Sequence, residues 1–308
     1  MSRLLTTSFL AMPTRRLRHN DRKRIRVVAT HLRARVSCNR ETGLEVDLDL
    51  TLPTLLAPLV LIAIVYVIFI FLTNTSFQRT DTAYYNYLIS AFQHGRTNLV
   101  GSGTYDLSQY NGKWYMYWGP SPILFVLPFY VLSNIQASDV IYGFVAGLIN
   151  VLLFTGCTIE FLRFFRLKIS QFSHIFVILN FAIISPNFYS SLGGKIWYVN
   201  QIISVLYLLA FIYFTFKFLN TQRLLYLSLA ALFFNLAWNA RLSLIFHGLL
   251  FLYVIAVLYL RHRQLLWRAI GITAATTLIA LAGFFYYNTA RFSNPLEFGY
   301  SYQTPAAR

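Results

Sequence analysis

The sequence predicts an all-α membrane protein: a polytopic helix bundle of about seven spans, with a large first external loop carrying an amphipathic helix and a β-hairpin. Hydrophobic residues make up 57% of the 308 residues and charged residues 12%, with a mean hydropathy of +0.54, which is far more apolar than a soluble domain. Lys and Arg gather at the N-terminus and between alternate apolar runs, as cytoplasmic loops require. We therefore expect an inner or plasma membrane, with the N-terminus inside and the C-terminus outside.

Residues 1–50 form a basic region that holds eleven of the 26 Lys and Arg residues. They lack the apolar core and cleavage site of a secretory signal peptide. Two interpretations stay open: a cytoplasmic tail that sets orientation and touches anionic membrane lipid, or an organelle transit peptide. Most other cations lie between apolar runs, so the net charge of +16 reflects membrane topology and does not predict nucleic-acid binding. Residues 51–308 are expected to form the transmembrane domain.

Seven apolar segments are expected to cross a hydrocarbon core of about 30 Å, at a rise of about 1.5 Å per residue. They are Leu52–Thr73, Val140–Leu162, Phe172–Tyr189, Ile196–Phe216, two spans within Leu224–Tyr259, and Ala269–Tyr287. A single helix over 224–259 would exceed the bilayer thickness, so a turn near Asn239 to Leu242 is expected to divide it. The shorter run 123–132 is expected to lie at the interface or to enter the bilayer partway.

Residues 74–137 form the predicted first external loop. Apolar residues recur at three- and four-residue spacing between Ala83 and Phe92, which predicts an amphipathic helix that begins near Asp81. Asn111 and Gly112 stand between two runs rich in Tyr and Trp, which indicates a two-residue hairpin turn. Prolines 120 and 122 then mark the entry to the next apolar helix.

Charged residues near the external side are the candidates for function. Arg241 interrupts an apolar stretch, where a charge costs about 2.5–3.5 kcal/mol at mid-bilayer, so it needs an anionic partner or water. Lys195 and Arg291 lie just outside spans on the same side, and with Asp81 they are candidates to converge at an opening. The alternative is that lipid phosphates satisfy all three cations. Asp81 is either a helix N-cap or a functional acid.

Aromatic residues are dense between Tyr105 and Trp118, which indicates a membrane-interface belt or a platform for a sugar or a lipid headgroup. Tyr84 and Trp114 are accordingly candidate substrate-binding residues. If a divalent metal assists, Asp81 and Asp106 are the available hard oxygen ligands, although two acids do not specify a site. Oligomeric state is left open.

The external loop resembles the first external loop of C-type glycosyltransferases, the multispanning enzymes related to protein O-mannosyltransferases and the lipid A aminoarabinose transferase. A weaker resemblance extends through the later spans to residues 290–300. The segments that carry the resemblance in the loop are residues 81–85, 94–96, 105–107, 110–115 and 119–122.

The resemblance implies a transferase that moves a sugar from a polyprenyl-phosphate donor to an external acceptor, with the Asp81 carboxylate in the first loop as a general base or a group that orients the acceptor hydroxyl. Thr82 stands where the family usually has a second acid. The family generally has more than ten spans and often a soluble C-terminal domain, so the resemblance also predicts a truncated or inactive relative as an alternative. Such a relative would act as a membrane binding or assembly protein. A transporter is least supported, because ionisable residues within the spans are few.

Overall fold

The computed structural model describes residues 52–73, 82–102, 105–133 and 138–303. The basic region 1–50 and Asp81 lie outside the described residues. The helices of the bundle are α1 (Leu52–Leu72), α4 (Asp139–Phe165), α5 (Gln171–Leu179), α6 (Pro186–Leu192), α7 (Ile196–Thr221), α8 (Leu224–Ala240), α9 (Leu249–Arg261) and α10 (Arg263–Phe292). Shorter turns are the π-helix η1 (Asn180–Ile184) and the 3-10 helices η2 (Leu242–Gly248) and η3 (Tyr300–Tyr302). The loop elements are α2 (Tyr84–Gln93), α3 (Ile123–Ser133), β1 (Ser108–Tyr110) and β2 (Lys113–Tyr115).

Long apolar helices confirm the all-α membrane bundle. Within the described ranges, four helical segments are long and apolar enough to cross a membrane: Asp139–Phe165, Ile196–Thr221, Leu242–Arg261 and Arg263–Phe292. The broken helix of α5, η1 and α6, bent by 42°, makes a fifth if it is counted as one span. The chain is therefore an integral membrane protein. For the shorter apolar helix α8 and for α1, crossing stays a prediction.

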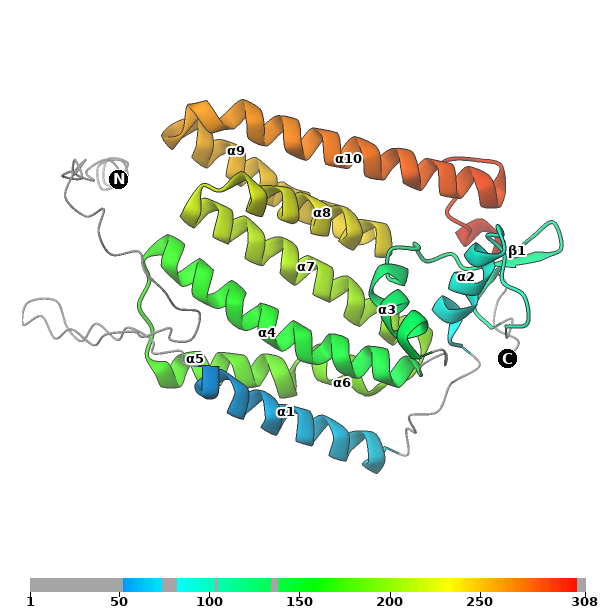
Figure 1. The fold of residues 1–308 in the computed structure, drawn as a ribbon, viewed down its shortest axis with the longest axis horizontal. Coiled ribbons are helices and arrows are strands. Elements are labelled where there is room, and N and C mark those ends of the chain that lie inside the picture. Colours follow the sequence, from blue (N-terminus) through cyan, green and yellow to red (C-terminus); the bar gives the residue numbers. More distant parts are fainter. Residues whose placement is uncertain (1–51, 74–81, 103–104, 134–137, 304–308) are drawn as a thin grey trace, which may run out of the picture.

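The helices lie side by side in one row, with α4, α7 and α8 at its centre (Figure 1). The helices α1, α5 and α6 cover one side of this centre, and α9 and α10 cover the other. The elements α2, α3, β1 and β2 gather at one end of the row, together with the C-terminal end of α10 (Figure 1). The break between α8 and η2 falls at Arg241, which confirms the expected turn near Asn239 to Leu242.

The bend after α5 follows from local chemistry. Pro186 has no backbone N–H to continue the preceding helix, and the Ser185 side chain caps the new one by accepting from the Asn187 N–H at 3.1 Å. The hydroxyl of Tyr66 donates to the Ala182 carbonyl oxygen at 2.7 Å, which joins α1 to the π-helical turn. Asn150 donates to the Asn187 side chain at 3.0 Å and joins α4 to α6. Buried polar partners thus hold the bend inside the bundle.

Two buried hydrogen bonds fasten α2 to the bundle. The Tyr85 hydroxyl donates to Asn200 Oδ1 in α7 at 2.9 Å, and the Tyr142 hydroxyl of α4 donates to Asn86 Oδ1 at 2.7 Å. Around them, residues of α2, α4 and α7 form one apolar core that includes Leu88 and Ile203. The helix that directly follows Asp81 in sequence is therefore held firmly over the ends of α4 and α7.

The two short strands β1 and β2 pair antiparallel, with Gln109 opposite Trp114, and Asn111 and Gly112 join them. Both connecting residues have positive φ, 48° and 71°, the combination that a two-residue turn between twisted strands requires. Ser108 also pairs with Gln303, so the C-terminal segment lies along the free side of β1. This pairing brings the last described residues to the same end of the bundle as α2.

Candidate functional site: an aromatic pocket with two arginines

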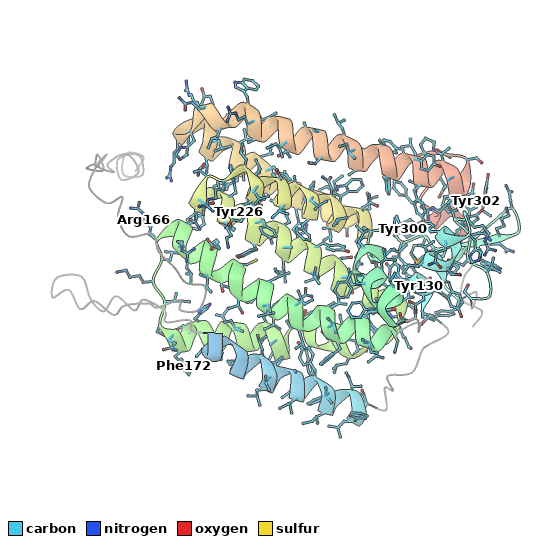
Figure 2. All side chains as sticks on the ribbon, in the orientation of Figure 1. Tyr130, Arg166, Phe172, Tyr226, Tyr300 and Tyr302 are labelled. Atoms are coloured by element: carbon cyan, nitrogen blue, oxygen red, sulfur yellow. The ribbon has the colours of Figure 1, made fainter. Side chains whose placement is uncertain are left out.

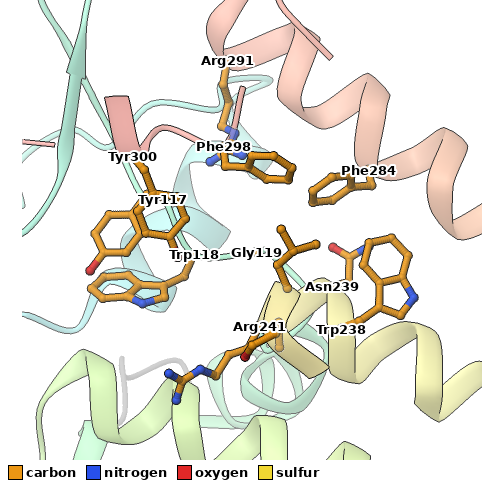
Figure 3. A pocket seen from close by; sticks show the side chains of 13 residues that line it. Tyr117, Trp118, Gly119, Trp238, Asn239, Arg241, Phe284, Arg291, Phe298 and Tyr300 are labelled. Atoms are coloured by element: carbon orange, nitrogen blue, oxygen red, sulfur yellow. The ribbon is translucent and has the colours of Figure 1, made fainter. Parts of the chain in front are cut away.

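A pocket of about 270 Å³ lies where α8, α10, the segment after β2 and the C-terminal segment meet. We call it the arginine pocket, because the side chains of Arg241 and Arg291 both line it (Figure 3). Its remaining lining consists of Gly119, of residues 239, 240, 242 and 243 at the junction of α8 and η2, and of aromatic rings. The rings belong to Tyr117, Trp118, Trp238, Phe284, Phe298 and Tyr300. A few polar groups among aromatic walls are typical of ligand pockets.

Arg241 lies at the break between α8 and η2 and is exposed. Its backbone N–H donates to the Ala237 carbonyl oxygen at 3.0 Å and ends α8, while its side chain extends along the lower rim of the pocket in Figure 3. Among the described residues, no carboxylate oxygen lies within 4.0 Å of its guanidinium. Arg241 therefore offers a full positive charge to whatever occupies the pocket.

Arg291 is different, because only 3% of the residue is exposed. Its guanidinium donates to the Met116 carbonyl oxygen and, at 2.6 Å, to Asn288 Oδ1, and it stacks on Tyr287 with 4.1 Å between guanidinium carbon and ring centroid. Its Nε has no hydrogen-bond partner within the described part of the chain. These contacts make Arg291 a fixed buried charge in the pocket wall, which favours an anion nearby.

Gly119 sets the distance between the segment after β2 and the C-terminal end of α8, which form two walls of the pocket. A Cβ at this position would meet the Asn239 carbonyl oxygen at 1.4 Å, so only glycine permits the approach. Next to it, the Ser121 hydroxyl donates to the Leu236 carbonyl oxygen at 2.7 Å. The segment after β2 is therefore pressed against the C-terminal end of α8, and Tyr117, Trp118 and Arg241 line the same pocket.

Three of the predicted residues lie outside this pocket. Lys195 is exposed at the start of α7, with its Nζ 5.6 Å from the centroid of the Trp197 ring. Tyr84 is fully buried, and its hydroxyl donates to the Tyr105 carbonyl oxygen. Trp114 is half-buried in β2, where its carbonyl oxygen accepts from the Leu99 N–H at 2.8 Å. Of the predicted substrate-binding residues the structure thus brings only Arg241 and Arg291 together, and substrate contact for the others stays a prediction.

Asp106 has a structural role in the loop. Its Oδ2 accepts from the Tyr117 hydroxyl at 3.0 Å, and its Oδ1 accepts from Gln303 Nε2 at 2.5 Å. Both oxygens therefore have partners within the described part of the chain, and a role for Asp106 as a metal ligand stays a prediction. In the described ranges no group of three or more His, Cys, Asp or Glu residues could hold a metal ion. Asp81, the other predicted ligand, cannot be placed because it lies outside those ranges.

Burial and the neighbouring Asp106 carboxylate both act on Tyr117. Burial raises the pKa of the Tyr117 hydroxyl well above its usual value, and the negative charge of Asp106 and the hydrogen bond to it raise it further. The Tyr117 hydroxyl is therefore protonated at neutral pH, and it remains a donor to Asp106.

Sequence reasoning missed the residues that complete the pocket. Tyr117 and Trp118 belong to the aromatic stretch between Tyr105 and Trp118, but no sequence pattern distinguishes them from its other aromatic residues. Tyr300 and Phe298 come from a segment after the last predicted span, and only the fold brings them to Arg241.

Comparison of the chain with protein-family models, with curated proteins and with solved structures finds no match. Fold and pocket define the class: an integral membrane protein with an aromatic, positively charged pocket at one end of its helix bundle. Any narrower assignment rests on the geometry of that pocket.

Proposed function

We propose that the chain is a membrane glycosyltransferase that moves a sugar from a polyprenyl-phosphate donor to an acceptor. The arginine pocket is the observation that carries this proposal. Arg241 and Arg291 line it together, and neither guanidinium has a carboxylate partner among the described residues. A phosphate supplies the missing negative charge and matches the planar donor geometry of arginine. The aromatic walls suit the uncharged remainder of such a donor.

We also propose the orientation that this chemistry needs. Lys217, Arg223 and Arg261 lie at helix ends on the side of the bundle opposite the pocket, and Figure 2 shows Arg166 at that same side. This asymmetry supports a cytoplasmic location for that end and an external location for the pocket and for the hairpin of β1 and β2. Seven crossings then follow from α1, α4, the bent helix, α7, α8, α9 with η2, and α10. The 17 residues of α8 extend about 26 Å at about 1.5 Å per residue, which is near the hydrocarbon thickness.

In the proposed reaction, an acceptor hydroxyl oxygen attacks the anomeric carbon of the donor sugar. The new carbon–oxygen bond forms as the bond from that carbon to the phosphate oxygen breaks, and the electron pair leaves with polyprenyl phosphate. The acceptor proton passes to the carboxylate of Asp81, the residue just before the described loop. Arg241 stabilises the negative charge of the departing phosphate. Polyprenyl phosphate therefore stays bound to Arg241 when the sugar has left.

The proposal is tested by transfer of radiolabelled sugar from polyprenyl-phosphate mannose, glucose or galactose in membranes that contain the protein. We expect transfer by the wild type, and a loss of about a hundredfold or more in Asp81→Asn, because a general base contributes about that much. Arg241→Gln should lower transfer, whereas Arg223→Gln, at the opposite end of α8, should not. Unchanged transfer in Arg241→Gln would contradict the pocket as the donor site. Donor binding without transfer by the wild type would favour the non-catalytic alternative.

A further inference from the structure

Three aromatic rings form a continuous wall on one side of the arginine pocket. The Tyr117 and Trp118 rings lie 4.1 Å apart between centroids, and the Tyr117 and Tyr300 rings lie 5.0 Å apart. Figure 3 shows these three side chains together, across the pocket from Trp238. Tyr300 remains 59% exposed despite this stacking. The wall therefore presents a large aromatic side chain to a ligand.

Tyr300 reaches this wall because its segment is held along β1. The buried Ser108 hydroxyl donates to the Gly299 carbonyl oxygen at 2.6 Å, and Ser108 pairs with Gln303 across the same edge. Gly299 has a φ of +94°, a backbone conformation open to glycine, and a Cβ there would meet Ser108 Oγ at 2.8 Å. These contacts hold the segment 299–303 against β1 and place Tyr300 in the wall of the pocket.

Asp106 joins the two parts of the wall. One carboxylate oxygen accepts from Tyr117 and the other from Gln303, residues that approach the loop from β2 and from the C-terminal segment. Asp106 itself has a φ of +58°, which Asn and Gly also tolerate. The Asp106 carboxylate thereby fixes the position of Tyr117 relative to the segment that carries Tyr300.

We propose that Tyr117, Trp118 and Tyr300 form a subsite for a neutral pyranose, and that Asp106 is the positioning residue that sets these rings. The C–H groups of a pyranose carry partial positive charge and pack on aromatic carbon, while its hydroxyls remain at the wet mouth of the pocket. Arg241, which also lines the pocket, takes the phosphate on the anomeric carbon. The identity of the phosphate carrier rests on the proposed function, but the sugar contact is a separate property of the wall.

The first experiment separates the sugar contact from the phosphate contact. The full chain in lipid nanodiscs is titrated with farnesyl phosphate and with its mannosyl, glucosyl and galactosyl derivatives. At least one glycosylated probe should bind the wild type about three- to tenfold more tightly than farnesyl phosphate. Tyr300→Leu should abolish this difference and leave the affinity for farnesyl phosphate unchanged. Tyr302→Leu is the matched control, because that ring contacts Tyr110 and Phe292 and does not line the pocket.

The second experiment tests the positioning role of Asp106. Asp106→Gly keeps the positive φ and removes the carboxylate, so it should lose the sugar-dependent gain in affinity as Tyr300→Leu does. Asp106→Asn should retain the gain, because its amide accepts from Tyr117 with its oxygen and donates to the Gln303 oxygen once that amide turns over. Equal loss in both variants, or no loss in Asp106→Gly, would overturn the positioning role.

The outcomes distinguish this inference from the proposed function. If the wild type binds farnesyl phosphate but none of the three sugars increases its affinity, the proposed sugar subsite is wrong. The proposal that the pocket binds a polyprenyl phosphate is not contradicted by that result. If Tyr300→Leu weakens all probes equally, the ring is structural and the subsite is again wrong. If farnesyl phosphate itself does not bind, the proposed donor falls. In that case the subsite is tested with methyl mannoside, methyl glucoside and methyl galactoside. Binding of at least one of them by the wild type, and its loss in Tyr300→Leu, would support the sugar subsite. No binding of any of the three would overturn the inference.

Discussion

Gly119 lies directly against the carbonyl group of Asn239, so close that a side-chain carbon at residue 119 would meet this oxygen at 1.4 Å. The contact joins the segment after β2 to the last turn of α8, the two elements that carry Tyr117 and Arg241. Tyr207 of α7 strengthens the junction, because its hydroxyl donates to the Ser121 carbonyl oxygen at 3.1 Å. The width of the arginine pocket therefore depends on the absence of a side chain at residue 119.

Gly119→Ala should separate these two elements. The added methyl meets backbone, which cannot rotate away, so we expect a loss of about 1–3 kcal/mol or more in the free energy of unfolding and weaker donor binding. Thermal melting in detergent and probe titration measure the two effects. Gly271→Ala in α10 is the control, because a Cβ there meets nothing within 4 Å. A melting temperature equal to that of the wild type would contradict the close contact.

Orientation in the membrane has its own test. A cysteine at Ser102, in the loop before β1, should react with an impermeant thiol reagent added outside intact cells. A cysteine at Gln222, between α7 and α8, should react only after the membrane is opened, because the Lys and Arg residues cluster at that end. The two native cysteines, Cys38 and Cys157, are first replaced by serine, so that only the introduced cysteine can react. The reverse labelling pattern would place the pocket on the cytoplasmic side and contradict the use of an externally delivered donor.

The raised pKa of Tyr117 predicts that the stability of the protein depends on pH in the alkaline range. Because the folded-state pKa of Tyr117 lies above the usual value of 10.0, its contribution to stability is complete below pH 10.0 and is lost as pH rises through the folded-state pKa. Wild-type protein should therefore lose more unfolding free energy above pH 10.0 than Tyr117→Phe, which has no proton to release. Melting curves of both proteins across this range measure the difference. Parallel pH profiles would show that Tyr117 is not perturbed by its surroundings.

The helices could be predicted from sequence because the length of an apolar run is a local property. The turn that divides residues 224–259 followed from the same arithmetic, and the structure places it at Arg241. Pro186 lies within the predicted span Phe172–Tyr189, but the 42° bend there was not predicted. Its π-helical turn depends on Tyr66 and Asn150, partners on other helices that no local pattern reveals.

The candidate site was only partly predictable. Arg241 was detectable because a charge inside an apolar run is costly and needs a reason. Lys195 and Arg291 were candidates because they lie just outside spans on one side. Sequence cannot tell which helix ends line the same pocket, and Lys195 lies outside it. The hydrogen bond between Asp106 and Gln303 joins residues 197 positions apart, and no local sequence pattern predicts that they are partners. The close approach of Gly119 to Asn239 was not predicted, because no sequence pattern indicates that a glycine packs against another helix.

The most direct test of lipid-phosphate binding in the arginine pocket is the dissociation constant of farnesyl phosphate for the wild type, Arg241→Gln and Arg223→Gln in nanodiscs. A hydrogen bond to a charged group contributes about 1.5–3 kcal/mol, so Arg241→Gln should bind about tenfold or more weakly. Arg223→Gln, exposed at the other end of α8, should stay within about twofold of the wild type. Wild-type affinity in Arg241→Gln would contradict phosphate binding at this pocket.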